Sequence, residues 1–311
     1  MDIAKAFDSI RWEYILTLLE HLGFPIRWRE WIAAILSTST SRVILNGVPN
    51  PPIWHGRGLR QGDPLSPLLF VIAIDPLQRL LEVATEFGML TKLRGRSPDL
   101  RISMFADDAV IFVTPTKGEV SMLARILELF GETTGLKTNF HKSTVVPIQC
   151  NNINLSDVLS GLPASRTSFP LKYLGLPLSM NRLKRVDFQP WIDKVSAKLS
   201  TWSGKNLSAA GRLTLVNAVL TSQVTYLLLA LKPPQRVLDF IDSKRKQFLW
   251  AGSERLTGGK CKVNWVCAAR PKQYGGLGIL HLGNFSRALR LRWLWQEAKL
   301  LNTQRMAKDI P

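Results

Sequence analysis

The hydrophobic pattern of the chain changes near residue 180, and this change limits the fold more than any other feature. Before that point, segments with helical apolar spacing alternate with short strand-like runs, whereas helical patterns dominate after it. The sequence therefore predicts an α+β domain, with helices on a short, mostly antiparallel sheet, followed by a helical region. Helices are expected at residues 9–23, 25–36, 66–88, 118–135, 190–202, 208–231, 234–250 and 285–300.

The stretch "RISMFADDAVIFV" at residues 101–113 has two apolar runs around a polar centre. This pattern predicts a β-hairpin with Asp107 and Asp108 at its tip. Adjacent carboxylates repel each other and need a compensating cation such as a divalent metal, although most such pairs only cap turns in solvent. "SRVILNGV" predicts a strand that ends in an Asn-Gly turn, and Ser66 is expected to cap a buried helix.

Positive charge is concentrated in the second half of the chain. Residues 1–150 carry 16 Lys and Arg against 15 Asp and Glu, whereas residues 151–311 carry 25 against 8. Six of the ten tryptophans also lie in the second half. Interleaved cations and aromatic rings are typical of nucleic-acid grooves, and a solvated basic surface over a tryptophan-containing core explains them equally well.

Several classes of protein do not fit the composition. Cys150, Cys261 and Cys267 form no CxxC pair, which argues against a disulfide framework or a closed zinc site. The longest apolar run, residues 68–74, is far shorter than the ~20 residues of a membrane span. No signal-peptide pattern opens the sequence. We therefore expect a soluble, intracellular protein without a membrane partner.

Five motifs resemble those of a known family. "DIAKAFD", "GLRQGDPLSPLLF", "FADD", "GLKTNFHKS" and "KYLGLPL" occur in the order and approximate spacing of the palm motifs of reverse transcriptases. The variants "RQGDPLSP" and "FADD" are similar to those of LINE-type non-LTR retrotransposons. "KYLGLPL" followed by "RPKQYGGLGIL" is similar to the plant members.

The resemblance implies an RNA-directed DNA polymerase that holds two Mg²⁺ ions. It implies that Asp2, Asp107 and Asp108 are the metal ligands and that Lys142 protonates the departing pyrophosphate. A second group of residues would contact the template, the incoming nucleotide or the primer. By resemblance these are Phe7 beside the sugar 2′ position, Arg60, Gln61 and Gly62 in the template and nucleotide motif, and Tyr173, Leu174 and Gly175 in the primer grip.

The resemblance also implies the organisation of the chain and its partners. Residues 1–180 would form an N-terminally truncated palm, 181–260 a helical thumb, and 261–311 the start of the region after the thumb. The expected partners are an RNA template, a DNA primer and deoxynucleoside triphosphates, in the nucleus.

The first motif begins at the second residue, with only Met1 before Asp2. We therefore expect Asp2 to lack ladder hydrogen bonds and to be poorly held. Together with the missing fingers region, this predicts a partial or degenerate copy that extends no primer by itself. The alternative function is that of an inactive remnant that only binds nucleic acid.

Overall fold

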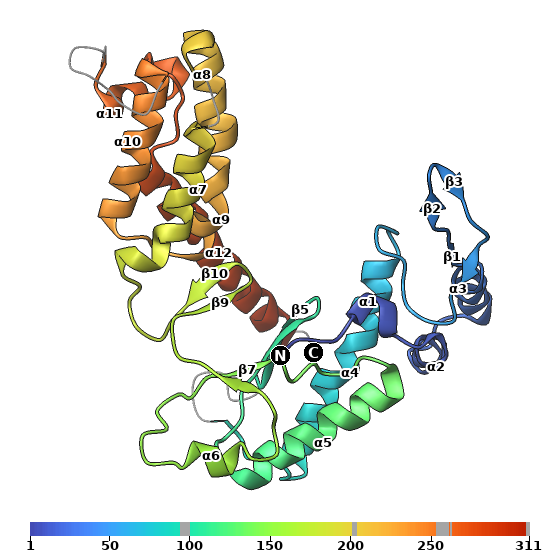
Figure 1. Cartoon of the computed structure of the whole chain (residues 1–311). Helices are drawn as coiled ribbons and strands as arrows, with labels where there is room; N and C mark the ends of the chain where they lie inside the picture. The colour runs from blue at the N-terminus through green and yellow to red at the C-terminus, as the bar shows by residue number, and fades with distance from the viewer. Residues whose placement is uncertain (94–99, 201–203, 253–260, 262, 309–311) are drawn as a thin grey trace. The chain divides into compact units, whose positions relative to one another are not determined.

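The computed structural model describes residues 1–308 except 94–99, 201–203, 253–260 and 262. The chain forms two compact units, Met1–Ser168 and Phe169–Pro311 (Figure 1). Each unit has its own hydrophobic core. The sequence pattern places the domain boundary at about residue 180, whereas packing divides the chain between Ser168 and Phe169.

The helices expected in the first unit are present, with two corrections. The helix expected from residue 9 begins only at Trp12, because Ser9 ends a separate short helix and the backbone at Ile10 and Arg11 is extended. Ser66 is the first helical residue rather than the cap, and Leu65 takes the cap position without a side-chain hydrogen bond. The helices of this unit are α1 (Ala6–Ser9), α2 (Trp12–His21), α3 (Ile26–Ser37), α4 (Ser66–Glu86), α5 (Lys117–Thr134) and α6 (Leu155–Val158).

The strands of the first unit are short and, as far as the chain is described, pair two by two. Antiparallel pairs join β1 to β4, β2 to β3 and β5 to β6, and a parallel pair joins β7 to β8. The expected Asn-Gly turn is present between β2 and β3, with Asn46 at φ 50° and Gly47 at φ 81°. The strands are β1 (Thr40–Ser41), β2 (Ile44–Leu45), β3 (Val48–Pro49), β4 (Ile53–Trp54), β5 (Ile102–Phe105), β6 (Asp108–Ile111), β7 (Thr144–Val145) and β8 (Ser165–Arg166). This mixture of helices and mostly antiparallel strand pairs agrees with the α+β class.

Helix α4 is the centre of the first core, as its apolar start predicts. Phe70, Leu77 and Leu81 are almost completely buried on this helix. They pack with Ile15 and Leu19 of α2 and with the buried face of α5 in one hydrophobic cluster. This core supports the strands and loops that carry the predicted catalytic motifs.

The second unit is mostly helical, as expected. It starts with a hairpin of β9 (Leu171–Tyr173) and β10 (Leu176–Leu178). Its longer helices are α7 (Gln189–Ser200), α8 (Ala209–Leu215), the π-helix η3 (Val216–Leu220), α9 (Ser222–Ala230), α10 (Gln235–Ala251) and α12 (Leu282–Lys308). Single turns complete it at η1 (Arg185–Phe188), η2 (Gly204–Asn206), α11 (Trp265–Ala268) and η4 (Lys272–Tyr274).

One helical stretch of the second unit, Ala209–Ala230, is long and apolar enough to cross a membrane by length and composition alone. Core helices of globular proteins pass the same test. Val216, Leu220 and Val224 within it are fully buried in the second hydrophobic cluster, which gives their apolar character a packing explanation.

Candidate functional site

Strands β5 and β6 form the hairpin that the "FADD" motif predicts. Phe105 pairs with Asp108, so that Ala106 and Asp107 make the two-residue turn at the tip. Ala106 adopts φ 53°, which is unusual for a residue with a Cβ. The turn places Asp107 at the exposed end of the hairpin and Asp108 at the start of β6.

A buried ion pair fixes the base of this hairpin. Arg101, just before β5, is 4% exposed and lies 3.9 Å from the carboxylate of Glu119 on α5. Its guanidinium donates to the carbonyls of Phe112, just after β6, and of Thr91. Glu119 in turn accepts from the backbone N–H of Thr91 (2.9 Å) and of Thr114 (3.2 Å). Burial lowers the pKa of Arg101, and the charge of Glu119 opposes this effect only in part. The buried pair therefore depends on these hydrogen bonds for its stability.

Asp2 is held on both sides, and the expectation that it lacks ladder hydrogen bonds is wrong. Asp2 forms a β-bridge with Asp108 of the hairpin. On its other side, its N–H donates to Ser143 Oγ (3.1 Å) and its carbonyl accepts from the N–H of Asn139 (2.9 Å). Residues 1–4 thus join the β5–β6 hairpin to the "GLKTNFHKS" segment at residues 135–143.

Met1 takes part in the same pairing. Its ammonium group donates to the carbonyl of Ala109 (2.8 Å), and its own carbonyl accepts from the N–H of Ala109 (3.2 Å). Burial lowers the pKa of this ammonium group, against the opposing effect of the charges on Asp108 and Asp2. Met1 is therefore tied to the hairpin on one side of Asp2, while Ile3 on the other side forms a β-bridge with Thr138.

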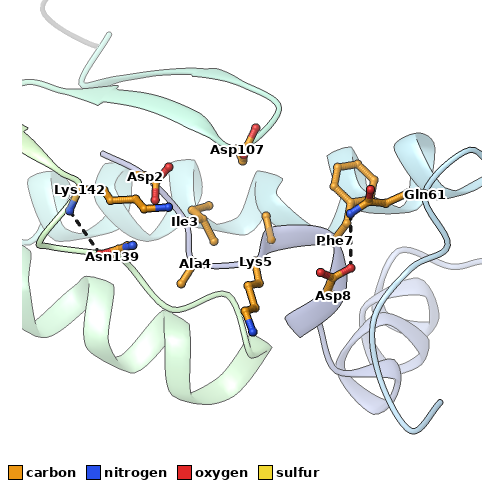
Figure 2. A pocket seen from close by; sticks show the side chains of 11 residues that line it. Asp2, Ile3, Ala4, Lys5, Phe7, Asp8, Gln61, Asp107, Asn139 and Lys142 are labelled. Carbon is orange, nitrogen blue, oxygen red and sulfur yellow. Dashed lines mark hydrogen bonds between the residues drawn. The ribbon is translucent and has the colours of Figure 1, made fainter. Parts of the chain in front are cut away.

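Most of the predicted catalytic residues line one cleft of about 470 Å³ (Figure 2). Asp2 and Asp107 reach it from the first segment and from the hairpin tip. Asp108 is exposed but does not line the cleft. The complete lining is Asp2, Ile3, Ala4, Lys5, Ala6, Phe7, Asp8, Gln61, Asp107, Asn139 and Lys142.

Phe7 and Gln61 form one end of the cleft. The ring of Phe7 stacks on Phe70 of α4, with centroids 4.7 Å apart, so that the core fixes its orientation. Gln61 Nε2 lies 3.5 Å from Asp8 Oδ1, at the limit of a hydrogen bond. The ring of Phe7, which the core supports, and the amide of Gln61 thus line the same end of the cleft.

The other two residues of the "RQG" motif do not line this cleft. Arg60 donates to Ser39 Oγ (2.9 Å) and to the carbonyl of Thr38 (3.1 Å), which anchors the loop before α4. Ser39 Oγ also contacts His55 Nδ1 at 2.9 Å. Gly62 adopts φ 93°, a conformation that strains any residue with a Cβ, and nothing lies within 4 Å of the position of such a Cβ.

Lys142 lies at the opposite end of the cleft from Gln61. Its side chain extends towards Asp2 in the view of Figure 2, and its backbone N–H donates to Asn139 Oδ1 (3.3 Å). Asn139 therefore supports both the Asp2 backbone and the loop that carries Lys142. An ammonium group in this position is suited to neutralise phosphate charge in the cleft.

Tyr173, Leu174 and Gly175 belong to the second unit. Leu174 (φ 49°) and Gly175 (φ 78°) form the tight turn between β9 and β10. The Leu174 carbonyl accepts a hydrogen bond from Tyr226 Oη on α9 (2.9 Å). This contact fixes the hairpin tip to the helical part of the same unit.

Residues 1–178 match the family described as reverse transcriptase (RNA-dependent DNA polymerase). The chain belongs to this family. The matched range covers more than half of the sequence and contains the complete cleft.

The relatives of this reverse transcriptase chain include proteins of mobile elements. It is 28% identical over 301 residues to an uncharacterized 149 kDa protein of the transposon TX1 of Xenopus laevis. The aligned region covers 94% of this chain and 22% of that relative. It is 27% identical over 305 residues to the Pol polyprotein of the type-2 retrotransposable element R2DM of Drosophila melanogaster, with 94% and 27% covered. A putative ribonuclease H protein of Arabidopsis thaliana is 34% identical over 121 residues, which cover 39% of this chain and 19% of the relative. The chain is thus a reverse transcriptase domain with non-LTR retroelement homologues, and it spans about a quarter or less of these relatives.

Reverse transcriptases generally use divalent metal ions. Within the described residues, no three His, Cys, Asp or Glu side chains lie close enough together to hold a metal ion by themselves. Mg²⁺ in nucleotide-processing sites is commonly bound by one or two carboxylates plus the phosphates of the substrate. Asp2 and Asp107, which line one cleft, fit this smaller donor set. The three cysteines of the chain are free thiols.

Four polar residues of the site were not predicted as site residues from the sequence. Asn139 and Ser143 hold the Asp2 backbone, and Lys5 and Asp8 line the cleft. The first two lie in the quoted "GLKTNFHKS" motif and the other two in "DIAKAFD". The position of these motifs in the motif order was therefore the available signal.

Proposed function

We propose that this chain carries the nucleotidyl-transfer site of an RNA-directed DNA polymerase, with Asp2 and Asp107 as its principal metal ligands. The observation that carries the proposal is the common cleft, where two carboxylates from distant segments face the same space as Phe7, Gln61 and Lys142. An arrangement of carboxylates, a cation and a bulky side chain is suited to phosphoryl transfer onto a sugar hydroxyl.

The proposed metal is Mg²⁺, in a two-ion site. Asp2 and Asp107 would hold it, with Asp108 as the accompanying carboxylate on the adjoining bridge. When bound, the metal would supply activation of the attacking hydroxyl and stabilisation of charge on the leaving oxygen. The chain's own contribution is to hold the two carboxylates in register through the pairing of Asp2 with the hairpin.

The remaining residues of the cleft have roles in binding and orientation. Phe7 limits the space beside the sugar 2′ position and so favours deoxynucleotides. Gln61 and Gly62 contact the template and the incoming nucleotide, and Lys142 gives a proton to the departing pyrophosphate. The first unit then corresponds to the palm and the helices of the second to the thumb, with Tyr173, Leu174 and Gly175 as primer grip. We also propose an RNA template and a DNA primer as the binding partners of the chain, and the nucleus as its location.

Primer extension tests this proposal directly. The full 311-residue chain is incubated with an RNA template, an annealed DNA primer, four deoxynucleoside triphosphates and Mg²⁺. We expect extension that EDTA abolishes and that RNA-template digestion before the reaction prevents. The expectation of inactivity depended partly on a poorly held Asp2, and the bridge to Asp108 removes that reason. Failure to extend, with intact binding of the template-primer, would count against the proposal.

A second candidate function is nucleic-acid binding without catalysis, favoured by the charge of residues 151–311. We expect the affinity of the full chain for mixed-sequence duplex to fall steeply with salt, with a log–log slope of about −0.9 per phosphate contacted. Contact with about six phosphates would weaken binding roughly a thousandfold between about 50 and 200 mM salt. Titration by fluorescence anisotropy measures this slope.

The control is an oligonucleotide analogue of the same sequence with an uncharged backbone, which should bind weakly at every salt concentration. A flat salt dependence with the natural duplex would contradict the electrostatic origin of binding. Tight, salt-dependent binding without any primer extension would favour this second function over the first.

A further inference from the structure

A second cleft of about 330 Å³ adjoins the first and carries only positive charge. Among the described residues that line it there are four cations and no carboxylate. The lining is Ala4, Lys5, Ser9, Arg11, Arg57, Gly135 and Lys137. We call it the basic cleft. Nothing in the resemblance to reverse transcriptases or in the matched relatives assigns it a ligand.

Backbone hydrogen bonds tie together the three segments that carry these cations. The N–H of Ala4 donates to the carbonyl of Lys137 (2.9 Å), and the N–H of Arg11 donates to the carbonyl of Thr134 (2.9 Å). The third segment is joined by the N–H of Gly58, which donates to the carbonyl of Ile10 (2.8 Å). The cations therefore project from a fixed frame, and their convergence is not an accident of flexible loops.

Two glycines permit this close approach of backbones. A Cβ on Gly135 would collide with the carbonyl of Ser9, and its φ of 86° also favours glycine. A Cβ on Gly58, next to Arg57, would lie 2.8 Å from the carbonyl oxygen of Asp8. The backbones that carry the cations thus approach one another closely at Gly135, which lines the basic cleft, and at Gly58, next to Arg57.

The four cations also lack the carboxylate partners that some other cations of this unit have. Within the described part of the chain, none of them forms a salt bridge, whereas Arg29 pairs with Glu20 and Lys117 with Asp157. Like charges gathered in one cleft repel each other, and an anion that binds between them relieves this repulsion. Three acidic residues, Asp2, Asp8 and Asp107, line the adjoining cleft instead.

Lys5 forms part of the wall between the two clefts, since Ala4 and Lys5 line both. Its backbone is left-handed, with φ and ψ of 47°. In Figure 2 its side chain points to the opposite side of its backbone from Asp107. An anion in the basic cleft would therefore lie next to the proposed reaction site, on the other side of the Lys5 backbone from Asp107.

We propose that the basic cleft binds a compact phosphate anion with several charges, of which inorganic pyrophosphate is the simplest example. Guanidinium groups bind phosphate oxygens in pairs, and two arginines with two lysines match an anion with three or four negative charges. The assignment of this anion as the reaction product rests on the proposed function. The binding site itself rests on the four cations and their frame.

Isothermal titration of the full chain with sodium pyrophosphate, in EDTA so that no metal links the anion to the acidic cleft, tests the proposal. We expect Arg11→Gln/Arg57→Gln to weaken pyrophosphate binding about tenfold or more, because two charge-assisted contacts are lost. Lys5→Gln/Lys137→Gln should give a similar loss from the other two cations. The matched control is Arg42→Gln/Lys92→Gln, which removes the same charge from exposed positions outside the cleft and should change the affinity less than twofold.

Equal losses in the cleft variants and the control would overturn the proposal, as would the absence of pyrophosphate binding to the unaltered chain. A loss confined to binding of a single-stranded oligonucleotide would overturn it in favour of a nucleic-acid contact. The titration requires no catalysis. Cleft-dependent pyrophosphate binding in a chain that extends no primer would support the site while counting against the polymerase.

Discussion

Replacement of Asp107 by asparagine should reduce primer extension by at least about a hundredfold, the loss typical for removal of one group that stabilises developing charge. Asparagine keeps the shape of the hairpin tip but removes the negative charge that holds a divalent cation. Asp107 is exposed, and its side chain has no hydrogen bond to any residue that the structure describes, so the substituted chain should unfold at the same temperature. Extension rates and thermal unfolding of both proteins measure the two effects.

The matched control is Asp157→Asn, which removes the same charge from an exposed salt bridge with Lys117 in the same unit. Exposed pairs of this kind contribute less than about 1 kcal/mol, and extension should be unchanged. A second readout is Mn²⁺ binding followed by electron paramagnetic resonance, which Asp107→Asn should weaken at least about tenfold. Unimpaired extension and unimpaired Mn²⁺ binding in Asp107→Asn would refute its role as a metal ligand.

Local sequence pattern was sufficient to predict most elements of the fold. Two apolar runs around Asp107 and Asp108 predict the hairpin, because alternation and turn residues act over a few positions. The buried character of α4 follows in the same way from its all-round apolar start. The misplaced cap at Ser66 shows the limit of such signals, since a serine can equally occupy the first helical position.

The arrangement of the site depends on contacts that no local pattern encodes. Asp2 pairs with Asp108 and with Asn139, more than a hundred residues away in sequence, and only the motif order suggested that they meet. The basic cleft is a stronger case. Lys5, Arg11 and Arg57 belong to segments that carry ordinary surface cations in the sequence, and backbone packing at Gly135 brings them together.

Arg245 fits neither interpretation of the positive charge in the second half of the chain, which the sequence analysis assigned to a surface for nucleic acid or to a solvated basic surface. This residue is completely buried on α10. Its guanidinium donates to Asp242 Oδ1 (2.6 Å), to Thr221 Oγ1 (3.0 Å) and to the carbonyl of Leu280 (3.1 Å). It thereby joins α10 to Thr221, just before α9, and to the segment before α12. The guanidinium also lies over the indole ring of Trp265, 5.7 Å from the ring centroid. One of the cations in the basic half of the chain thus holds the fold together.

Arg245→Met should destabilise the second unit by about 3–5 kcal/mol, the usual cost of removing one partner from a buried ion pair. Methionine fills much of the volume but leaves Asp242 without its counter-ion and the Leu280 carbonyl without its donors. Urea unfolding followed by tryptophan fluorescence, with six of the ten tryptophans in residues 151–311, measures the loss. Arg236→Met, on an exposed position of the same helix, is the control and should cost less than about 0.5 kcal/mol.

The pH dependence of this destabilisation distinguishes two causes, the uncompensated charge of Asp242 and the loss of packing around Arg245. Burial raises the pKa of Asp242, and the charge of Arg245 is the main influence that lowers it. Without Arg245 the pKa of Asp242 in the folded state should rise further above its value in the unfolded chain. A raised carboxyl pKa stabilises the folded state below the unfolded pKa, and this contribution is lost as pH rises through the folded value. The deficit of Arg245→Met should therefore shrink when the pH is lowered towards the ordinary range of an aspartate, because Asp242 is then neutral. A deficit independent of pH would show that lost packing and hydrogen bonds, and not the uncompensated carboxylate, cause the destabilisation.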